Sequence, residues 1–496
     1  MTLEAQTMAP LDVDGCPEDF AADRANLVAR TAATSVGVLP AATSDAGIRA
    51  LPREFSLDLK AGKATNQKRS GRCWMFGGLN ALRYETMHAW KLDDFEFSES
   101  YLYFWETLEK ANMYLEQVLA TLDEPSDSRL FEEINLDPGA DGGWFSLFAQ
   151  LVEKYGLMPK SAYPEVANSS DSDDFKQYLK TKLREIAAEL RAAHANGATV
   201  DELAARKADA MRTVYRMTSI ALGEPPATFD FLARREKDDD KPADAHANTD
   251  DIETAAAAAG ARGAADAKKT EPPLGEPRDG RDDRPQIRDF HLTPQEFARK
   301  YVSVDVRDYV TICNAPMART PFDTLYSLEL SGSIAGGRDV EMANLDLPTF
   351  KATILRQLKA GHPVTFACDC TQFALRKQGV FAREAVRVDE LFGTDFAMDK
   401  GAGLEYLDRC SNHIMTITGV DFDDKGEPDR WKIENSWGKD VGDDGYFVAS
   451  DDWFDEFVTE ADVRREFLDD KTKAVFEQQP VRLALWTPLS RSTRCR

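Results

Sequence analysis

The spacing of apolar residues changes along the chain, and this change limits the folds open to it. In residues 97–118 and 144–155, apolar and aromatic side chains recur at the spacing of helices that face a core, and Ser98 can cap the first of them. The last third instead carries short β-type runs, at 363–368, 414–420, 430–434 and 445–448, separated by Gly and Asp turns. The pattern predicts an α+β fold in which a mainly helical lobe precedes a lobe of antiparallel strands.

The middle of the chain predicts an insertion. Residues 174–222 carry Lys, Glu, Ala and Leu at helical spacing, which indicates amphipathic helices. Residues 236–284 contain no aromatic side chain and only Ile252 and Leu274 as large aliphatics, too little apolar surface to offset the entropy of ordering. We predict a disordered or extended segment there, with an interaction tail as the alternative. Order should resume near Thr293, which can cap a helix that has Pro294 at its first position and Glu296 completing a capping box.

With 496 residues, the chain exceeds the usual limit for one core. Five parts are predicted: a lead-in packing on the β lobe (1–50), a helical lobe with the nucleophile helix (51–170), a helical insertion (171–345), a β lobe (346–485) and a C-terminal arm (486–496).

Charge and cysteine content narrow the partners and the compartment. The net charge of −25 disfavours binding to a phosphate backbone, so nucleic acid is an unlikely partner. No stretch has the length of a signal peptide core or a membrane span, and the seven scattered cysteines are typical of reduced thiols, so a cytoplasmic location is expected. No cofactor or metal is predicted: Cys368 and Cys370, one residue apart without a nearby partner pair, make a poor zinc site.

Four residues together predict nucleophilic catalysis by a thiol. Cys73 lies at the start of a probable helix, where unpaired N–H groups and the helix dipole favour a thiolate, six residues after the amide of Gln67. His413 lies at the start of a predicted strand and can hold the thiol proton. Asn435 can accept a hydrogen bond from the imidazole, and a nearby Trp can shield that bond from water.

These residues, in the order Gln67, Cys73-Trp74, His413 and Asn435-Ser436-Trp437-Gly438, resemble the papain-like cysteine peptidases. Ser70 stands where secreted members usually carry a disulfide cysteine, and the separation from Cys73 to His413 is longer than usual by roughly two hundred residues. Further motifs around Cys73, Phe97, Asp141, Phe366 and Gly438 resemble the bleomycin hydrolase and aminopeptidase C branch, over residues 50 to 490 apart from the low-complexity segment.

The resemblance implies a two-lobed papain-like fold with a β-barrel-like second lobe, no removable propeptide, and a cytosolic homohexamer acting on peptides. It also implies roles for single residues. Trp144 directly follows the pair Gly142-Gly143, and Asn412 stands where the family often has Thr. Both positions depart from the common pattern of the family. The implied roles are nucleophile (Cys73), proton partner (His413), orienting residue (Asn435), oxyanion hole (Gln67), substrate binding (Gly142, Gly143, Asn412) and shielding (Trp437).

The resulting prediction is a cytosolic cysteine aminopeptidase. Residues 486–489 resemble the start of the family's C-terminal arm, which lies in the active-site cleft, but the tail beyond them is longer and carries three arginines. Such a tail could be trimmed, could occupy the cleft, or could lie elsewhere and leave a cysteine endopeptidase acting on oligopeptides. A binding or scaffold protein that keeps the fold without turnover is the alternative from another class.

Overall fold

The computed structural model describes residues 11–236, 274–275 and 286–494. Its mixture of helices and strands confirms the α+β class. The predicted disordered segment, residues 236–284, lies outside the described residues except for Glu236 and the two-residue strand β3 (Leu274–Gly275).

The first large group of elements is helical, as the spacing predicted. Helix α5 (Cys73–Trp90) is buried along most of its length and packs against α6 (Glu99–Ala120) and α8 (Phe145–Tyr155). The Ser98 side chain accepts a hydrogen bond from the Tyr101 N–H, which confirms the predicted N-cap of α6. Two shorter helices belong to this part of the chain: α7 (Arg129–Leu136) follows α6, and α9 (Ala167–Ser170) follows α8.

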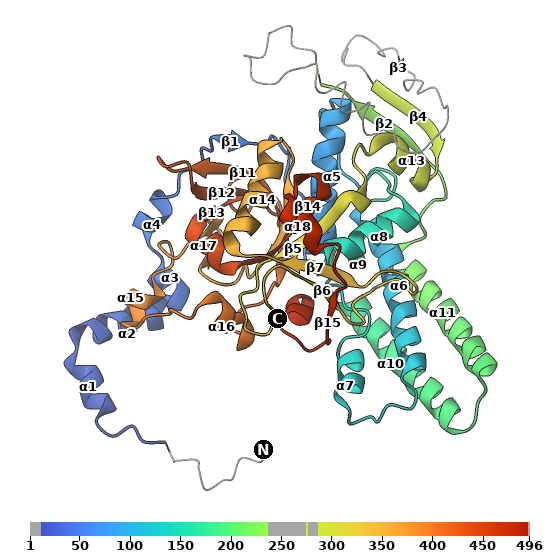
Figure 1. The fold of residues 1–496 in the computed structure, drawn as a ribbon, viewed down its shortest axis with the longest axis horizontal. Helices are drawn as coiled ribbons and strands as arrows, with labels where there is room; N and C mark the ends of the chain where they lie inside the picture. The colour runs from blue at the N-terminus through green and yellow to red at the C-terminus, as the bar shows by residue number, and fades with distance from the viewer. Residues whose placement is uncertain (1–10, 237–273, 276–285, 495–496) are drawn as a thin grey trace.

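Two long helices form a hairpin beside α6. Helices α10 (Asp173–Ala195) and α11 (Val200–Leu222) run side by side, and both contact α6 (Figure 1). Helix α13 (Pro294–Tyr301) follows the small antiparallel sheet of β2 (Phe229–Arg234), β4 (Gln286–Leu292) and β3. The predicted capping box of Thr293 and Glu296 is confirmed at the start of α13.

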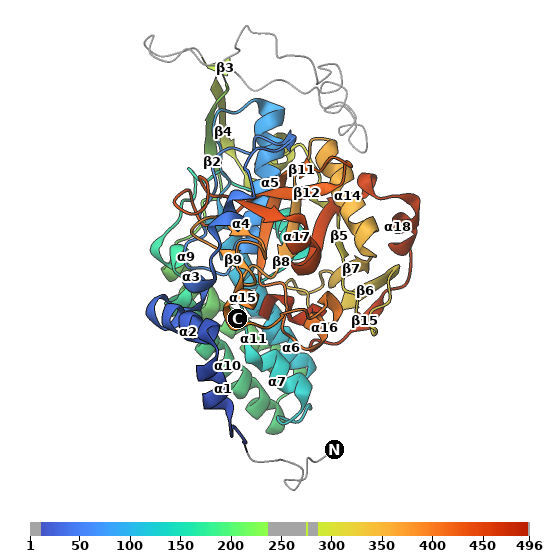
Figure 2. The ribbon, with the colours of Figure 1, turned by 90° about the vertical axis from the view of Figure 1, so that its left-hand side faces the viewer.

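One large sheet contains the four predicted strands. These are β8 (Val364–Cys368), β11 (His413–Phe422), β12 (Pro428–Glu434) and β13 (Tyr446–Ser450), and they pair antiparallel in that order. Helices α14 (Leu347–Lys359) and α17 (Asp451–Phe457) contact the sheet, and their apolar side chains share a core with it (Figure 2).

The sheet is larger than predicted and is not wholly antiparallel. The pairs β5–β7, β6–β15 and β10–β13 run parallel. Strands β5 to β7 come from residues 309–344, which the sequence assigned to the helical insertion. The strands missing from the prediction are β1 (Leu57–Asp58), β5 (Tyr309–Cys313), β6 (Thr324–Leu328), β7 (Val340–Asn344), β9 (Ala374–Leu375), β10 (Val380–Phe381), β14 (Val458–Arg464) and β15 (Val481–Leu483).

Short helices complete the fold. The N-terminal helices α2 and α3 contact α15, and the Thr43–Val386 bridge ties this region to the segment after β10. Within the described ranges, no helix has both the length and the apolarity that crossing a membrane requires. The remaining helices are α1 (Cys16–Ala22), α2 (Arg24–Val36), α3 (Val38–Ala42), α4 (Asp45–Arg49), α15 (Val388–Phe392), α16 (Lys400–Glu405) and α18 (Asp470–Val475).

Candidate active site

The thiol of Cys73 lies at the N-terminus of α5, as predicted. The N-cap residue Arg72 makes no side-chain capping bond to the helix, and the backbone N–H groups of Cys73 and Trp74, at the start of the helix, face the thiol. Burial raises the pKa of Cys73, whereas the backbone N–H groups of Ile414 and Trp74 lower it. Ile414 follows His413 directly, so this contact brings the start of β11 to the thiol.

The imidazole of His413 is held by Asn435, also as predicted. His413 is the first residue of β11, and its Nε2 lies 2.9 Å from the Asn435 Oδ1. The Trp437 ring stacks on the imidazole with the ring centroids 4.8 Å apart, which shields the hydrogen bond. Burial lowers the pKa of His413 to about 4; the bond to Asn435 opposes this shift, and the positive charge of Arg376 adds to it.

The side chain of Gln67 is fixed between two loops. Its Oε1 accepts a 2.6 Å hydrogen bond from the Ser436 hydroxyl, and its Nε2 donates to the Ser70 carbonyl at 2.6 Å. Its backbone N–H donates to the Ser436 carbonyl at 2.8 Å. Because a side-chain amide has two N–H donors, one donor remains for a ligand. The loop before Cys73 is thereby joined to the loop that carries Asn435.

Close packing between α5 and the sheet sets the distance between the two parts of the site. A Cβ placed on Gly77 would lie 2.9 Å from the Ile414 side chain, so only glycine allows this approach. The Thr416 hydroxyl donates to the Gly77 carbonyl at 3.2 Å. Farther along α5, Arg83 forms a buried ion pair with Glu434, the residue before Asn435.

The glycine pair is split between two environments. Lys110 donates to the Gly142 carbonyl at 2.5 Å, and Gly142 is partly exposed. Gly143 is buried, and a Cβ there would lie 2.7 Å from the Trp74 ring. Packing against Trp74 therefore explains the glycine at position 143, and of the two only Gly142 is placed where a substrate could approach.

Asn412 is tied to the loop after β8. Its Nδ2 donates to the Asp369 carboxylate at 2.7 Å, and its Oδ1 accepts from the Cys370 N–H at 3.0 Å. Both ends of the amide are therefore used within the protein. These bonds shape the loop after β8. Because an amide has two N–H donors and one of them is bonded to Asp369, the other remains, as for Gln67, and the predicted substrate-binding role of Asn412 stays a prediction.

The other cysteines have varied settings. In the described part of the chain, no group of three or more His, Cys, Asp or Glu side chains could hold a metal ion. Cys410 is disulfide-bonded, so the expectation that all cysteines are reduced is wrong at this position.

The start of the C-terminal arm packs on the helical part of the molecule. Leu489 of the arm, and Leu485 just before it, are buried in the same core as Ile134 of α7, and Arg491 forms a 2.9 Å ion pair with Glu133. Residues 489–494 form a 3₁₀ turn. A cavity of about 110 Å³ is lined by residues of this arm and by the predicted substrate loop, among them Leu485, Ser490, Gly142 and Trp144.

Two charged pairs near the site were not predicted from the sequence. Arg72 is fully buried and paired with Glu165, and Arg83 is paired with Glu434 across more than three hundred residues of chain. The Arg376 guanidinium lies 4.0 Å from the centroid of the Trp437 ring, the same ring that stacks on His413. The only sequence signal for Arg72 was its position beside the nucleophile.

The site places a histidine–asparagine pair beside the N-terminus of the helix that carries Cys73, an arrangement suited to thiol-dependent hydrolysis. Comparison with known proteins gives the family, because the model of the Peptidase C1-like family matches residues 10–250 and 278–490. The chain belongs to this family and is a cysteine-type peptidase.

Similar proteins cover nearly the whole chain. Aminopeptidase C of Lactobacillus delbrueckii subsp. lactis is 36% identical over 93% of this chain and 93% of its own length. Aminopeptidase C of Streptococcus thermophilus is 36% identical over 88% of this chain and 87% of its own length. The crystal structure of pepw from Lactobacillus rhamnosis matches with a TM-score of 0.86 and 35% identity, over 98% of this chain and 99% of that chain.

Proposed function

We propose that this protein is a cysteine aminopeptidase that removes N-terminal residues from peptides through an acyl-enzyme. The observation that carries the proposal is the hydrogen bond from His413 to Asn435 under the Trp437 ring, beside the N-terminus of the helix that bears Cys73. The similarity to aminopeptidases over nearly the whole chain supports the exopeptidase assignment.

Each residue has a defined task in this reaction. The Cys73 sulfur attacks the scissile carbonyl carbon, and His413 accepts the thiol proton. The oxyanion is stabilised by the free N–H of the Gln67 amide and by the Cys73 backbone N–H. The C–N bond breaks as His413 returns the proton to the leaving amine, and water then hydrolyses the thioester. Asn435 keeps the imidazole oriented throughout.

The arm favours cleavage at the N-terminus over cleavage within a peptide. Leu485 and Ser490 line the same cavity as Gly142, so the arm lies beside the loop that we assign to substrate binding. The ion pair between Arg491 and Glu133 and the burial of Leu489 fix the arm there. For a substrate that runs from Cys73 past Gly142, the arm would limit the length of peptide on that side. An endopeptidase requires the arm to be displaced.

Paired substrates test the proposal. A peptide amide with a free α-amine and the same peptide with an acetylated amine should differ strongly in kcat/KM, with the free amine preferred. Cys73→Ala should abolish both activities, because it removes the nucleophile and leaves the fold. Equal cleavage of both substrates indicates the endopeptidase, and unchanged activity in Cys73→Ala indicates that the chain is a scaffold.

Three broader properties belong to the same proposal. We infer a two-lobed papain-like architecture with a barrel-like β lobe, supported by separate apolar cores around α6 and around β11. We also infer a cytoplasmic location and a homohexamer, both implied by the family resemblance, and no role for nucleic acid, supported by the net charge of −25. Analytical ultracentrifugation tests the hexamer, which a monomeric mass would refute.

A further inference from the structure

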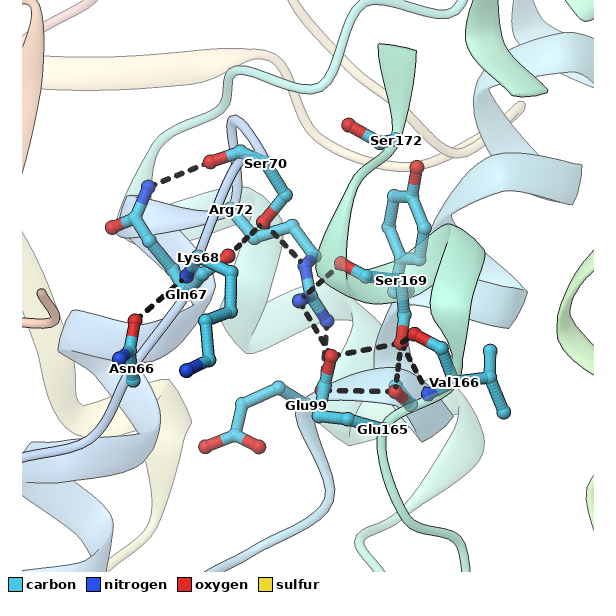
Figure 3. Close-up of polar contacts among 12 residues, drawn as sticks. Asn66, Gln67, Lys68, Ser70, Arg72, Glu99, Glu165, Val166, Ser169 and Ser172 are labelled. Atoms are coloured by element: carbon cyan, nitrogen blue, oxygen red, sulfur yellow. Dashed lines mark hydrogen bonds and ion pairs between the residues drawn. The ribbon is translucent and has the colours of Figure 1, made fainter. Parts of the chain in front are cut away.

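The loop from Gln67 to Cys73 carries both proposed oxyanion donors, so its shape sets the distance between them. Within it, the Ser70 hydroxyl donates to the Gln67 carbonyl at 2.7 Å, while the Gln67 Nε2 donates to the Ser70 carbonyl at 2.6 Å (Figure 3). Lys68 has a φ of 54°, in the left-handed region that is disfavoured for residues other than glycine. Surrounding contacts must therefore hold the loop in this conformation.

Arg72 supplies such contacts from inside the protein. Its side chain is fully buried, and its Nε donates to the Ser70 hydroxyl at 2.9 Å. Its two terminal nitrogens donate to the two carboxylate oxygens of Glu165 at 3.0 and 2.8 Å. The Ser169 carbonyl accepts another bond at 2.6 Å. One guanidinium thus connects the oxyanion loop to a second segment about a hundred residues away, as Figure 3 shows.

The partner carboxylate is itself fixed. Glu165 also accepts hydrogen bonds from the Ser100 hydroxyl at 2.9 Å, at the start of α6, and from the Ser169 hydroxyl at 2.8 Å, in α9. The Arg72 guanidinium lies between the rings of Phe76 and Tyr103, 5.1 Å from each centroid. Polar and aromatic contacts therefore leave the guanidinium a single orientation.

We propose that the Arg72–Glu165 pair positions the oxyanion hole, through the bond from Arg72 to Ser70 and from Ser70 to Gln67. The pair is a positioning device and touches no substrate atom. Because Glu165 neutralises the charge of Arg72 at close range, the pair acts through geometry rather than through attraction to the thiolate. The inference rests on the proposed function, since it assumes that Gln67 and the Cys73 N–H bind an oxyanion.

Two reactions of the same thiol separate this role from a general structural one. Amide hydrolysis passes through an oxyanion, whereas alkylation by iodoacetamide forms an S–C bond with loss of iodide and needs only the thiolate. We expect Arg72→Met to lower kcat about 10²-fold, as for loss of an oxyanion donor, with little change in KM. The alkylation rate of Cys73 and its pH dependence should match those of the wild type.

Two further variants sharpen the test. Arg72→Lys keeps the charge but cannot form the two-pronged contact to Glu165, so it should not restore kcat. Combining Arg72→Met with Gln67→Ala should lower kcat no further than the worse single variant, because both remove the same donor. The matched control is Arg307→Met, which breaks an exposed Arg–carboxylate pair with Asp305 and should leave kcat unchanged.

The outcomes of these experiments decide between a positioning role and a general structural role for Arg72. Unchanged kcat in Arg72→Met, additive losses with Gln67→Ala, or equal losses in hydrolysis and alkylation would each overturn the inference. If Arg72→Met does not fold, Ser70→Ala removes the connecting hydroxyl and leaves the buried pair intact. That variant should lower kcat with unchanged alkylation, and an unchanged kcat refutes the connection. Failure of the proposed function itself is recognised separately, by a wild type without thiol-dependent hydrolysis.

Discussion

Replacing Arg83 by Met should destabilise the protein more than almost any other single change near the site. The ion pair of Arg83 with Glu434 joins the nucleophile helix to the strand that leads to Asn435, and the two side chains are 4% and 0% exposed. Removing one partner of such a pair leaves a buried charge without compensation, which costs about 3–5 kcal/mol. Glu434→Met should cost a similar amount, because it leaves Arg83 charged and without its partner.

The double variant Arg83→Met, Glu434→Met makes the test quantitative. It removes both charges, but the carbonyls of Ala61 and Lys63 lose the bonds that Arg83 donates at 3.0 and 2.6 Å. Lys63 is exposed, so its carbonyl can bind water instead, and the buried acceptor left unsatisfied is the Ala61 carbonyl. One such acceptor costs about 1–3 kcal/mol, so the double variant should lose about that amount. The two single losses should therefore exceed the double loss by at least about 3 kcal/mol.

Urea unfolding followed by tryptophan fluorescence measures these differences in the free energy of unfolding. The reasoning is refuted if the single losses add up in the double variant, or if Arg83→Met costs under about 1 kcal/mol, the value of an exposed pair.

The same variant should show a characteristic pH dependence. Burial raises the pKa of Glu434, and Arg83 opposes this shift, so removing Arg83 raises the pKa further. The carboxyl then stays protonated in the folded chain at pH values where it is ionised in the unfolded chain. Because unfolding releases a proton there, stability falls as the pH rises. The loss relative to the wild type should grow from about pH 5 upward.

Three further perturbations follow from the site. Arg376→Met removes the positive charge that lowers the pKa of His413, so the limb of the pH profile of kcat/KM that reports His413 should move to higher pH; a downward shift of that limb would contradict the geometry. Gly143→Ala places a methyl 2.7 Å from the Trp74 ring and should cost about 1–3 kcal/mol and lower kcat, as thermal unfolding and peptide hydrolysis will report. Leu489→Ala removes a buried anchor of the arm and should raise kcat/KM for N-acetylated relative to free peptides; an unchanged ratio argues against a limiting role of the arm.

The sequence predicts those parts of the fold that local patterns encode. Ser98 and Thr293 are followed by helical spacing, and their caps are present in the structure. Strand β5 was missed because residues 171–345 were assigned to a helical insertion; its five residues are all buried, as are those of the predicted strand β8. Strand β14 was missed because it carries Glu460 and Asp462. Acidic residues so close together indicate a surface segment in a sequence, but both are buried here.

The residues of the site also divide into those that the sequence predicts and those that it does not. Cys73, His413 and Asn435 are recognisable because their chemistry and order along the chain resemble a family. Arg72 and Arg83 are not, since an arginine in a sequence does not reveal that its carboxylate partner lies far along the chain in a buried setting. Their roles depend on which segments meet, and that follows only from the packing of the whole molecule.

Strand register explains why a buried pair so distant in sequence matters to the reaction. Glu434 pairs with Thr416 across β11 and β12, three residues from His413. Successive strand residues face opposite sides, so a slip of one residue would turn His413 away from Asn435. Strand β11 is buried over its first eight residues and pairs irregularly with β12 between Ile417 and Gly419, so its apolar pattern resists such a slip only weakly. Arg83 binds Glu434 from the nucleophile helix, which fixes this register relative to Cys73 and links the orientation of His413 to the position of the thiol.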